Sequence, residues 1–318
     1  MTKPETSFNL ITAEEAIEQA KEYTRKRSTG EIKSLLTPWK GFNKRGINGL
    51  EWGTINTIGG MSSAGKTAVA SILETGLFDL NPKEDFACLN LCFEMKASKL
   101  IGRKLSSKLK ISTTQLYSGD TIFNNFEDLN KYSEELKKHE VYYLEDYTTV
   151  IGIKNVFVQL YNHLNPNAKN IPLDQHKGLV LFLDHSILVK KDSENSRLDA
   201  LHGLCEMFND LKKKYKGIFI ILTQLNRSIE ASERRDEDKN QILHFVTRSD
   251  IYGGESLFQF SDIVLIIHRP EILNITRYGP DGWVTKDKIF FHYIKTRESE
   301  PGITIMKNNL KNNEIIEE

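Results

Sequence analysis

One short string, at residues 60–67, constrains the fold of this chain more than any other part of its sequence. It matches the pattern G-x-x-x-x-G-K-[ST] at every position, follows an apolar run at 54–58 and opens a helical pattern. Glycines in such a string let backbone N–H groups wrap a phosphate chain at the N-terminus of a helix, where the helix dipole also favours anions. The string therefore predicts a phosphate-binding loop. Its nucleotide-binding residues are Gly60, Met61, Ser62, Ser63, Ala64, Gly65, Lys66 and Thr67.

Metal-binding side chains are expected at the same place. The Thr67 hydroxyl can ligate Mg²⁺, and Lys66 can reach the outer phosphates of ATP. The apolar run at 179–183 ends in Asp184, which can hold Mg²⁺ through water. An aspartate that simply ends a strand is common, but a phosphate loop in the same chain favours the metal-binding role. The sequence therefore predicts ATP and Mg²⁺ as cofactors, with Thr67 and Asp184 at the metal.

Hydrolysis of the nucleotide also needs a group that orients the attacking water. Glu94 directly follows one apolar run, and Glu145 and Asp146 follow the next. We favour Glu94, because the end of its strand is expected to open beside the phosphate loop. Gln224 also ends an apolar run, where ligands of open α/β sheets collect. Its amide can sense the outermost phosphate; the alternative is a hydrogen bond to a neighbouring loop.

Short apolar runs alternate with helical patterns from residue 54 onward. The runs are 54–58, 87–93, 141–144, 179–183, 218–222 and 263–267, and the helical patterns are 66–78, 97–110, 126–139, 150–164 and 196–215. This alternation is typical of a mostly parallel sheet covered by helices on both faces. Further runs at 288–294 and 303–306 flank a polar turn with Pro301 and Gly302, which predicts an antiparallel hairpin on the sheet edge. The predicted fold class is therefore α/β.

Residues 1–30 are predicted to form a separate segment ahead of one domain at 31–318. Thr12 and Glu15 make a capping box, and apolar residues recur at helical spacing through 12–27, after which 26–30 has the composition of a hinge. A lone amphipathic helix must bury its apolar stripe, either on a neighbouring subunit or on its own domain. Spacing alone does not separate these two possibilities.

Composition and charge exclude several classes of protein. The 39% of apolar and 27% of charged residues are ordinary for a globular domain, and 43 basic residues balance 43 acidic ones. Binding to nucleic acid must therefore use a local patch. The three cysteines, Cys88, Cys92 and Cys205, fit a reduced core, and neither residues 1–9 nor any apolar run fits a leader or a membrane span. We expect a soluble, cytoplasmic protein with no membrane partner.

Several strings, taken in order, resemble the C-terminal motor domain of DnaB-type replicative helicases, which has a RecA-like fold. The similarity covers about residues 30–306. The matching strings are 29–30, 49–53, 60–67, 93–95 with Arg103 downstream, Asp184, 223–228, 249–262 and 268–271. Several such strings in the family's order are far more specific than any one of them alone. The resemblance implies a RecA-like P-loop ATPase.

The resemblance also implies a role for residues at the strand ends. Glu94 corresponds to the catalytic glutamate, Asp184 to the metal-side aspartate and Gln224 to the phosphate-sensing glutamine. Lys295 and Arg297 resemble the family's Lys-x-Arg, whose two catalytic side chains reach the ATP of the adjacent subunit. An exposed lysine and arginine at a hairpin tip can act in this way, since an arginine finger strongly accelerates hydrolysis. The alternative is a solvated basic turn.

Single-stranded DNA is the polymer that the resemblance implies. The residues that fall at the family's DNA-binding loop are Gly253, Gly254, Glu255 and Ser256. Small residues let main-chain N–H groups approach phosphates without sequence preference. The chain departs from the family pattern at two places. Tyr252, Gly253 and Gly254 stand where Arg, Glu and Ser are common, and His185, which we interpret as a packing residue, stands where a tyrosine usually follows the aspartate.

The function implied by the resemblance is that of an ATP-dependent DNA helicase motor in replication. It would hydrolyse ATP at the subunit interfaces of a ring, expected to be a homohexamer, and translocate on single-stranded DNA, with primase or a helicase loader as further partners. We expect the family's N-terminal helical domain to be missing, with the helix at 12–27 in place of the linker helix, as would suit a bacterial mobile element or a phage-infected cell. Two alternatives stay open: a RecA/RadA-like recombination ATPase, and a KaiC-like regulatory ATPase that binds no DNA.

Overall fold

The structure is a computed structural model that describes residues 10–118, 125–191, 196–231, 234 and 244–318. The sequence predicts no leader at residues 1–9, and these residues lie outside the described part of the chain. The chain divides into two compact units, Met1–Ser34 and Leu35–Glu318. The division at residue 30 that the sequence predicts stays a prediction.

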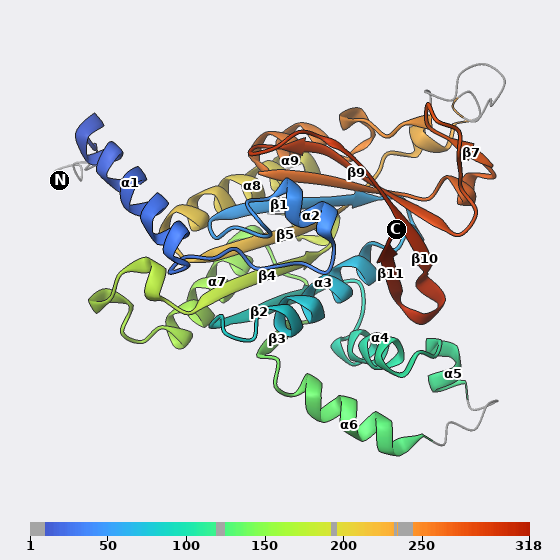
Figure 1. Cartoon of the computed structure of the whole chain (residues 1–318), viewed down its shortest axis with the longest axis horizontal. Helices are drawn as coiled ribbons and strands as arrows, with labels where there is room; N and C mark the ends of the chain where they lie inside the picture. The colour runs from blue at the N-terminus through green and yellow to red at the C-terminus, as the bar shows by residue number, and fades with distance from the viewer. Residues whose placement is uncertain (1–9, 119–124, 192–195, 232–233, 235–243) are drawn as a thin grey trace. The chain divides into compact units, whose positions relative to one another are not determined.

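A mixed sheet forms the centre of the second unit (Figure 1). Among the described residues it has nine strands in the order β11-β10-β9-β6-β1-β5-β4-β2-β3. The strands from β3 to β6 in this order run parallel, and β9, β10 and β11 extend the sheet in antiparallel fashion. Their bounds are β1 Thr54–Gly60, β2 Phe86–Cys92, β3 Val141–Leu144, β4 Gly178–Asp184, β5 Gly217–Gln224, β6 Ile263–His268, β9 Lys288–Thr296, β10 Gly302–Asn309 and β11 Glu314–Glu317. A separate pair is formed by β7 Arg277–Tyr278 and β8 Trp283–Val284.

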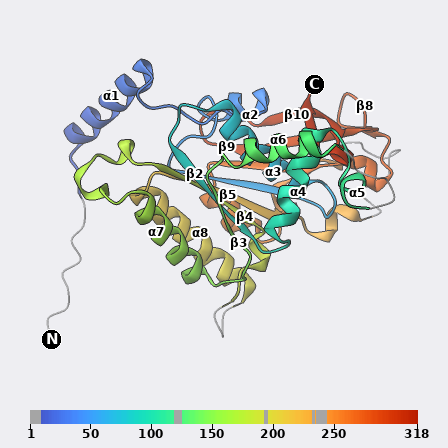
Figure 2. The same ribbon diagram turned by 90° about the horizontal axis from the view of Figure 1, so that it is seen from below.

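Helices cover both faces of this sheet, as the alternation of patterns predicts (Figures 1 and 2). In Figure 2, α7 and α8 lie on one side of the sheet and α3 on the other; α9 packs on α8, α4 packs on α3, and α6 packs on α4. The helices are α2 Lys40–Arg45, α3 Lys66–Leu80, α4 Ala97–Leu109, α5 Thr113–Tyr117, α6 Phe126–Leu136, α7 Val150–Leu164, α8 Arg197–Lys214 and α9 Gly254–Phe260. No helix among the described residues is both long and apolar enough to cross a bilayer.

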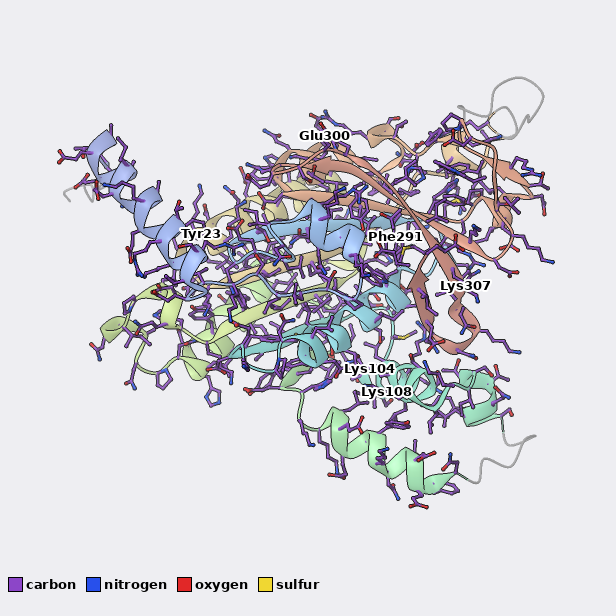
Figure 3. The ribbon with its side chains drawn as sticks, in the orientation of Figure 1. Tyr23, Lys104, Lys108, Phe291, Glu300 and Lys307 are labelled. Carbon is purple, nitrogen blue, oxygen red and sulfur yellow. The ribbon has the colours of Figure 1, made fainter. Side chains whose placement is uncertain are left out.

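The core explains why the apolar runs became strands. Every residue of β2 and β4 is buried, because helices pack on both sides of them. The antiparallel extension joins the same core: Phe291 of β9 (Figure 3) packs edge-on against Trp39, with ring centroids 5.3 Å apart. The six predicted runs correspond to β1–β6, and the predicted hairpin corresponds to β9 and β10. The strands β7, β8 and β11 were not predicted.

The parallel strands define two ends of the sheet. The C-terminal ends of β1, β2, β4, β5 and β6 lie together at one end of the sheet, which we call the carboxyl edge. We call the opposite end, where these strands begin, the amino edge. Because β9 is antiparallel to β6, Thr296 near its end pairs with Ile263 at the start of β6, so β9 finishes at the amino edge. This difference separates the candidate site residues into two groups.

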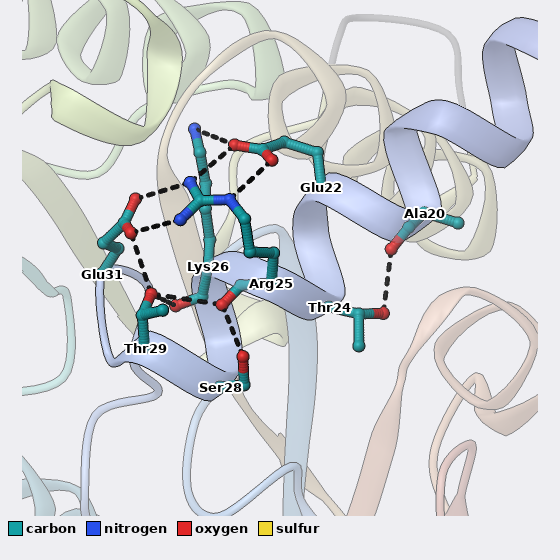
Figure 4. Close-up of polar contacts among 8 residues, drawn as sticks. All are labelled: Ala20, Glu22, Thr24, Arg25, Lys26, Ser28, Thr29 and Glu31. Carbon is teal, nitrogen blue, oxygen red and sulfur yellow. Dashed lines mark hydrogen bonds and ion pairs between the residues drawn. The ribbon is translucent and has the colours of Figure 1, made fainter.

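The first unit contains α1, Ala13–Thr29, which begins at the predicted capping box and ends at Gly30 in the left-handed conformation (φ 77°). Arg25 binds two carboxylates, that of Glu22 at 2.8 Å and that of Glu31 at 2.7 Å (Figure 4). Within this unit no residue of the helix is buried. Polar contacts and caps therefore hold the helix together, and its capping box is the one that the sequence predicts.

Candidate active site

The predicted phosphate loop lies between β1, which ends at Gly60, and α3, which begins at Lys66. Gly65 precedes the helix in the left-handed region (φ 102°), which favours glycine. A Cβ atom on Gly60 would lie 3.0 Å from the Lys66 Cγ and 3.2 Å from the carbonyl oxygen of Ile267. Both glycines of the pattern are thus favoured, Gly65 by its backbone conformation and Gly60 by the close approach of its neighbours.

Lys66 and Gln224 meet beside this loop. The Lys66 ammonium donates hydrogen bonds to the carbonyl oxygens of Gly60 (2.8 Å) and Met61 (2.9 Å) and to Gln224 Oε1 (2.8 Å). The Gln224 amide in turn donates to the Ser62 hydroxyl at 3.0 Å. Burial lowers the pKa of Lys66. The partners of the lysine are neutral oxygens, which suits a group that exchanges carbonyl oxygens for phosphate.

Thr67 and Asp184 also meet. The Thr67 hydroxyl donates to Asp184 Oδ2 at 2.9 Å, while the buried Asp184 Oδ1 has no hydrogen-bond partner among the described residues. Burial raises the pKa of Asp184 to about 6. A hydroxyl and a carboxylate with one open oxygen fit Mg²⁺, which takes few protein ligands and completes its shell with phosphates and water. Groups of three or more His, Cys, Asp or Glu able to hold a metal do not occur among the described residues.

Glu94 lies two residues beyond the end of β2, whose Cys92 pairs with Asp184 of β4. Its carboxylate is half exposed and stands 3.9 Å from Nε2 of His185. The competitor Glu145 accepts a hydrogen bond from the backbone N–H of Ala97 at 2.8 Å, at the start of α4. The geometry therefore favours Glu94 over Glu145 and Asp146, because Glu94 follows β2, which pairs with β4, whereas Glu145 and Asp146 follow β3, one strand farther from Asp184.

Two residues without a predicted role border the phosphate loop. Arg269, directly after β6, donates to the carbonyl oxygen of Ser63 at 3.0 Å, and burial lowers its pKa. Leu310 lies over Gly65, where an added Cβ would be 3.0 Å from Leu310 Cδ1. Arg269 has the strand-end signal that identified Asp184 and could have been found in the same way. Nothing in the local sequence indicates Leu310, because it reaches the loop through the fold of the C-terminal strands.

Lys295 and Arg297 lie at the amino edge, away from the phosphate loop of the same chain. Lys295 donates to the carbonyl oxygens of Phe258 and Gln259, the latter at 3.1 Å, and Arg297 Nε lies 2.9 Å from Asp262 Oδ1. The seven residues of β1 separate the two edges by about 20 Å at the usual rise per residue. The structure therefore does not bring this pair to the nucleotide site of its own chain.

The residues Gly253 to Ser256 form the first turn of α9 rather than an open loop. Gly253 has φ 63°, and a Cβ there would lie 2.3 Å from Leu201 of α8. Gly254 is buried and its N–H donates to the carbonyl oxygen of Ile251 at 3.0 Å. Ser256 shares a hydrogen bond of 3.1 Å with His202, and Glu255 forms an ion pair with Arg248. Their binding to DNA stays a prediction.

Comparison with known proteins adds the family. Residues 35–309 match the family described as the DnaB-like helicase C terminal domain. The replicative DNA helicase DnaB of Helicobacter pylori is 29% identical over 231 residues, which cover 72% of this chain and 41% of the relative. The protein of the same name from Buchnera aphidicola subsp. Baizongia pistaciae is 25% identical over 249 residues, covering 76% and 50%. This chain thus spans half or less of the length of these relatives.

Solved structures show the same fold. A structure described as a DnaB-like replicative helicase and its interactions with primase has a TM-score of 0.74 at 17% identity and covers 98% of this chain and 68% of that one. A second structure, described as an ATPase domain, has a TM-score of 0.74 at 17% identity and covers 94% of this chain and 98% of that one. The predicted RecA-like core is therefore confirmed. With the family match across most of its length, the chain belongs to the DnaB-like helicase C-terminal domain family.

Proposed function

We propose that this chain is an ATP-dependent DNA helicase motor, which hydrolyses ATP between neighbouring copies of itself and translocates on single-stranded DNA during replication. Membership of the family and the names of the relatives support this proposal. The observation that carries it is the pair of contacts at the carboxyl edge, Lys66 with Gln224 and Thr67 with Asp184, in which Lys66 and Asp184 are buried. Within this site, Asp184 Oδ1 is buried and has no hydrogen-bond partner among the described residues, so it can still accept a ligand.

The residues of this site have distinct roles in the proposal. Residues 60–67 bind the phosphates of ATP, and Lys66 exchanges its carbonyl partners for the outer phosphates. Thr67 and Asp184 hold Mg²⁺, which when bound offsets the charge of the phosphoryl group. Glu94 orients the attacking water and accepts its proton. Gln224, which bonds both Lys66 and Ser62, is placed to sense whether the last phosphate is present.

The remaining catalytic groups come from a second copy. Lys295 and Arg297 lie at the amino edge, so we assign them to the nucleotide bound by the neighbouring subunit of a ring. We propose that this ring is a hexamer. A head-to-tail interface of this kind closes into a ring when the rotation permits. Residues 253–256 are proposed to contact DNA phosphates, and α1 to contact the neighbouring subunit. We extend the proposal to a primase or a loader as partner, and to the cytoplasm as location.

The experiment that tests the proposal measures phosphate release and strand separation with the purified chain. We expect ATP hydrolysis that single-stranded DNA stimulates, unwinding of a forked duplex, and loss of both with Lys66→Ala. Hydrolysis that DNA does not stimulate would favour the KaiC-like alternative. Stimulated hydrolysis with forks left intact would favour the RecA/RadA-like alternative. Electron micrographs with ATP and single-stranded DNA would show whether rings or filaments form.

A further inference from the structure

Asp262 lies at the amino edge, just after α9 and just before β6. It contacts β1, α8 and the residue Arg297 that follows β9. Its backbone N–H donates to the carbonyl oxygen of Ile55 at 2.7 Å, and its Oδ2 accepts from the Ile55 N–H at 2.8 Å. The same carboxylate lies 3.0 Å from the Lys212 ammonium, near the end of α8. Asp262 is therefore fixed to β1 and α8 independently of the hairpin that follows β9.

Arg297 is attached to Asp262 at two points. Its backbone N–H donates to the Asp262 carbonyl oxygen at 3.1 Å, and its Nε lies 2.9 Å from Asp262 Oδ1. Neither of its terminal nitrogens has a hydrogen-bond partner among the described residues, and its side chain is 48% exposed. The carboxylate thus fixes the inner nitrogen of the guanidinium and leaves free the two nitrogens that can bind a phosphate bidentately.

Asp262 has a cationic partner besides Arg297. Lys212 and the Ile55 N–H already satisfy Oδ2, and the side chains of Asp262 and Lys212 are only 15% and 13% exposed. When the free nitrogens of Arg297 engage a phosphate, the carboxylate keeps a cation beside it. This arrangement orients the arginine at little cost to the stability of the fold.

We propose that Asp262 is a positioning residue that aims Arg297 at the nucleotide of the neighbouring subunit. This inference rests on the proposed role of Arg297 between subunits. Holding the inner nitrogen removes freedom of the long side chain before the transition state forms, so the gain appears in turnover and not in nucleotide binding.

The first test compares Asp262→Asn with Lys212→Met. The asparagine keeps an acceptor for the Ile55 N–H but loses the charge that holds Arg297, so we expect kcat to fall by about 10- to 100-fold with KM for ATP within about threefold. Lys212→Met removes the other ion pair of the same carboxylate and should leave kcat within about twofold. Asp262→Asn removes the carboxylate that pairs with the largely buried Lys212, so this variant can fold poorly. In that case the double variant D262N/K212M, which leaves no unpaired lysine, is measured in its place. A kcat that stays within about threefold of wild type in the folded variant would overturn the inference.

The second test locates the defect by mixing subunits. Asp262→Asn protein mixed with Glu94→Gln protein should regain activity, because about a quarter of random interfaces then combine an intact phosphate-loop half with an intact Arg297 half. Mixed with Arg297→Ala protein it should regain none. Recovery with Arg297→Ala instead of Glu94→Gln would assign the defect to the phosphate-loop half and overturn the inference.

The single and double variants distinguish the failure of this inference from the failure of the proposed function. The variant D262N/R297A should be no slower than Arg297→Ala alone, since the aspartate acts only through the arginine. Full activity of Arg297→Ala would overturn both the role between subunits and the positioning. An inactive Arg297→Ala beside a fully active Asp262→Asn would overturn the positioning alone.

Discussion

The two edges of the sheet carry the same kinds of side chain and hold them in different ways. At the carboxyl edge, Lys66 bonds Gln224 and the backbone of the phosphate loop, and Thr67 bonds Asp184, all at 2.8–2.9 Å; Lys66 and Asp184 are buried. At the amino edge, Arg297 is bonded to a carboxylate already paired with Lys212, and half of its side chain faces solvent. The polar side chains at the carboxyl edge thus contact residues of their own chain, whereas Arg297 at the amino edge is open to contact with another molecule.

This difference teaches how an active site can be divided within one sheet. Parallel strands collect their C-terminal ends at one edge, where the polar residues that follow them converge. An antiparallel strand such as β9 delivers its last residues to the opposite edge. In the proposed function, the amino edge of one copy therefore completes its site with the carboxyl edge of another copy.

The largest expected effect is that of Arg297→Ala. Loss of an arginine finger lowers kcat by about 10³- to 10⁵-fold. Its half-exposed pair with Asp262 contributes less than about 1 kcal/mol to folding, so the variant should remain folded. Mixing Arg297→Ala with Glu94→Ala protein should restore activity at mixed interfaces, as measured by phosphate release.

The control for this prediction is Arg277→Ala, which removes an exposed arginine whose side chain bonds the carbonyl oxygen of Gly282. It should leave kcat unchanged. Absence of any recovery in the mixture, or a rate per chain that persists at extreme dilution, would contradict the division of the site between two copies.

Lys66→Ala should act at the carboxyl edge alone. Removing the cation that faces the outer phosphates is expected to lower kcat on the order of 10³-fold. Lys177→Ala is the matched control, because Lys177 stands at the opposite end of the same sheet, 2.6 Å from Glu140 and 3.1 Å from Asp85. Equal losses of phosphate release in the two variants would remove the functional distinction between the edges.

A third prediction concerns stability. Lys104 on α4 (Figure 3) forms a buried ion pair with Glu74 on α3 and donates to the Tyr143 hydroxyl at 2.9 Å. Burial opposes the charge of Lys104, but Glu74 and Tyr143 outweigh it and raise its pKa. The pair joins the helix that begins at Lys66 to the helix that follows Glu94, so it supports the carboxyl edge.

Lys104→Met would leave the Glu74 carboxylate buried without a cation, held by the Asn90 amide at 2.8 Å, which is expected to lower the free energy of unfolding by about 3–5 kcal/mol. The double variant E74L/K104M should regain most of this loss, because two apolar residues leave no buried charge. Urea denaturation measures both. A loss for Lys104→Met as small as that for Arg297→Ala would show that the two edges are held equally weakly.

The strand-end residues show how far sequence reasoning reaches. Asp184, Gln224 and Glu94 each follow an apolar run, and the parallel sheet placed them around the phosphate loop where that pattern predicts. The rule needs only local sequence and one property of parallel sheets. Their positions were therefore predictable, whereas their catalytic roles stay predictions.

Contacts made by tertiary packing were not predictable. The pairing of Asp262 with Arg297 depends on the register of β6 and β9, and the position of Leu310 over Gly65 depends on where the turn between β10 and β11 lies. Gly253 suggested an open backbone, but the close approach of α8 is what requires a glycine there. These features follow from three-dimensional neighbours that no periodicity reports.

The smallest expected effect is on the pH dependence of the free energy of unfolding. It also concerns the carboxyl edge, where His268 is the last residue of β6. Burial lowers the pKa of His268 to about 3 and that of His292 on β9 well below its usual value. Titratable and polar groups around His268 are Arg234, Asp250, His244, Tyr278 and His292. Neither ring nitrogen of His268 has a hydrogen-bond partner among the described residues, so no hydrogen bond stabilises its protonated form.

In the unfolded chain a histidine binds a proton below a pKa of about 6.5, whereas the pKa of His268 in the folded chain is about 3. The unfolded state therefore binds the proton first as the pH falls below 6.5, and the free energy of unfolding decreases. Between pH 7 and pH 5 the loss is about 2 kcal/mol for each such histidine. His268→Leu should reduce the pH dependence of unfolding by this amount, measured as the change in urea midpoint between the two values. The difference between variant and wild type removes the opposite contribution of Asp184, whose raised pKa favours folding in acid. His163→Leu, at an exposed position of α7, should keep the full dependence, and an equal reduction in both variants would place the acid-sensitive group outside the carboxyl edge.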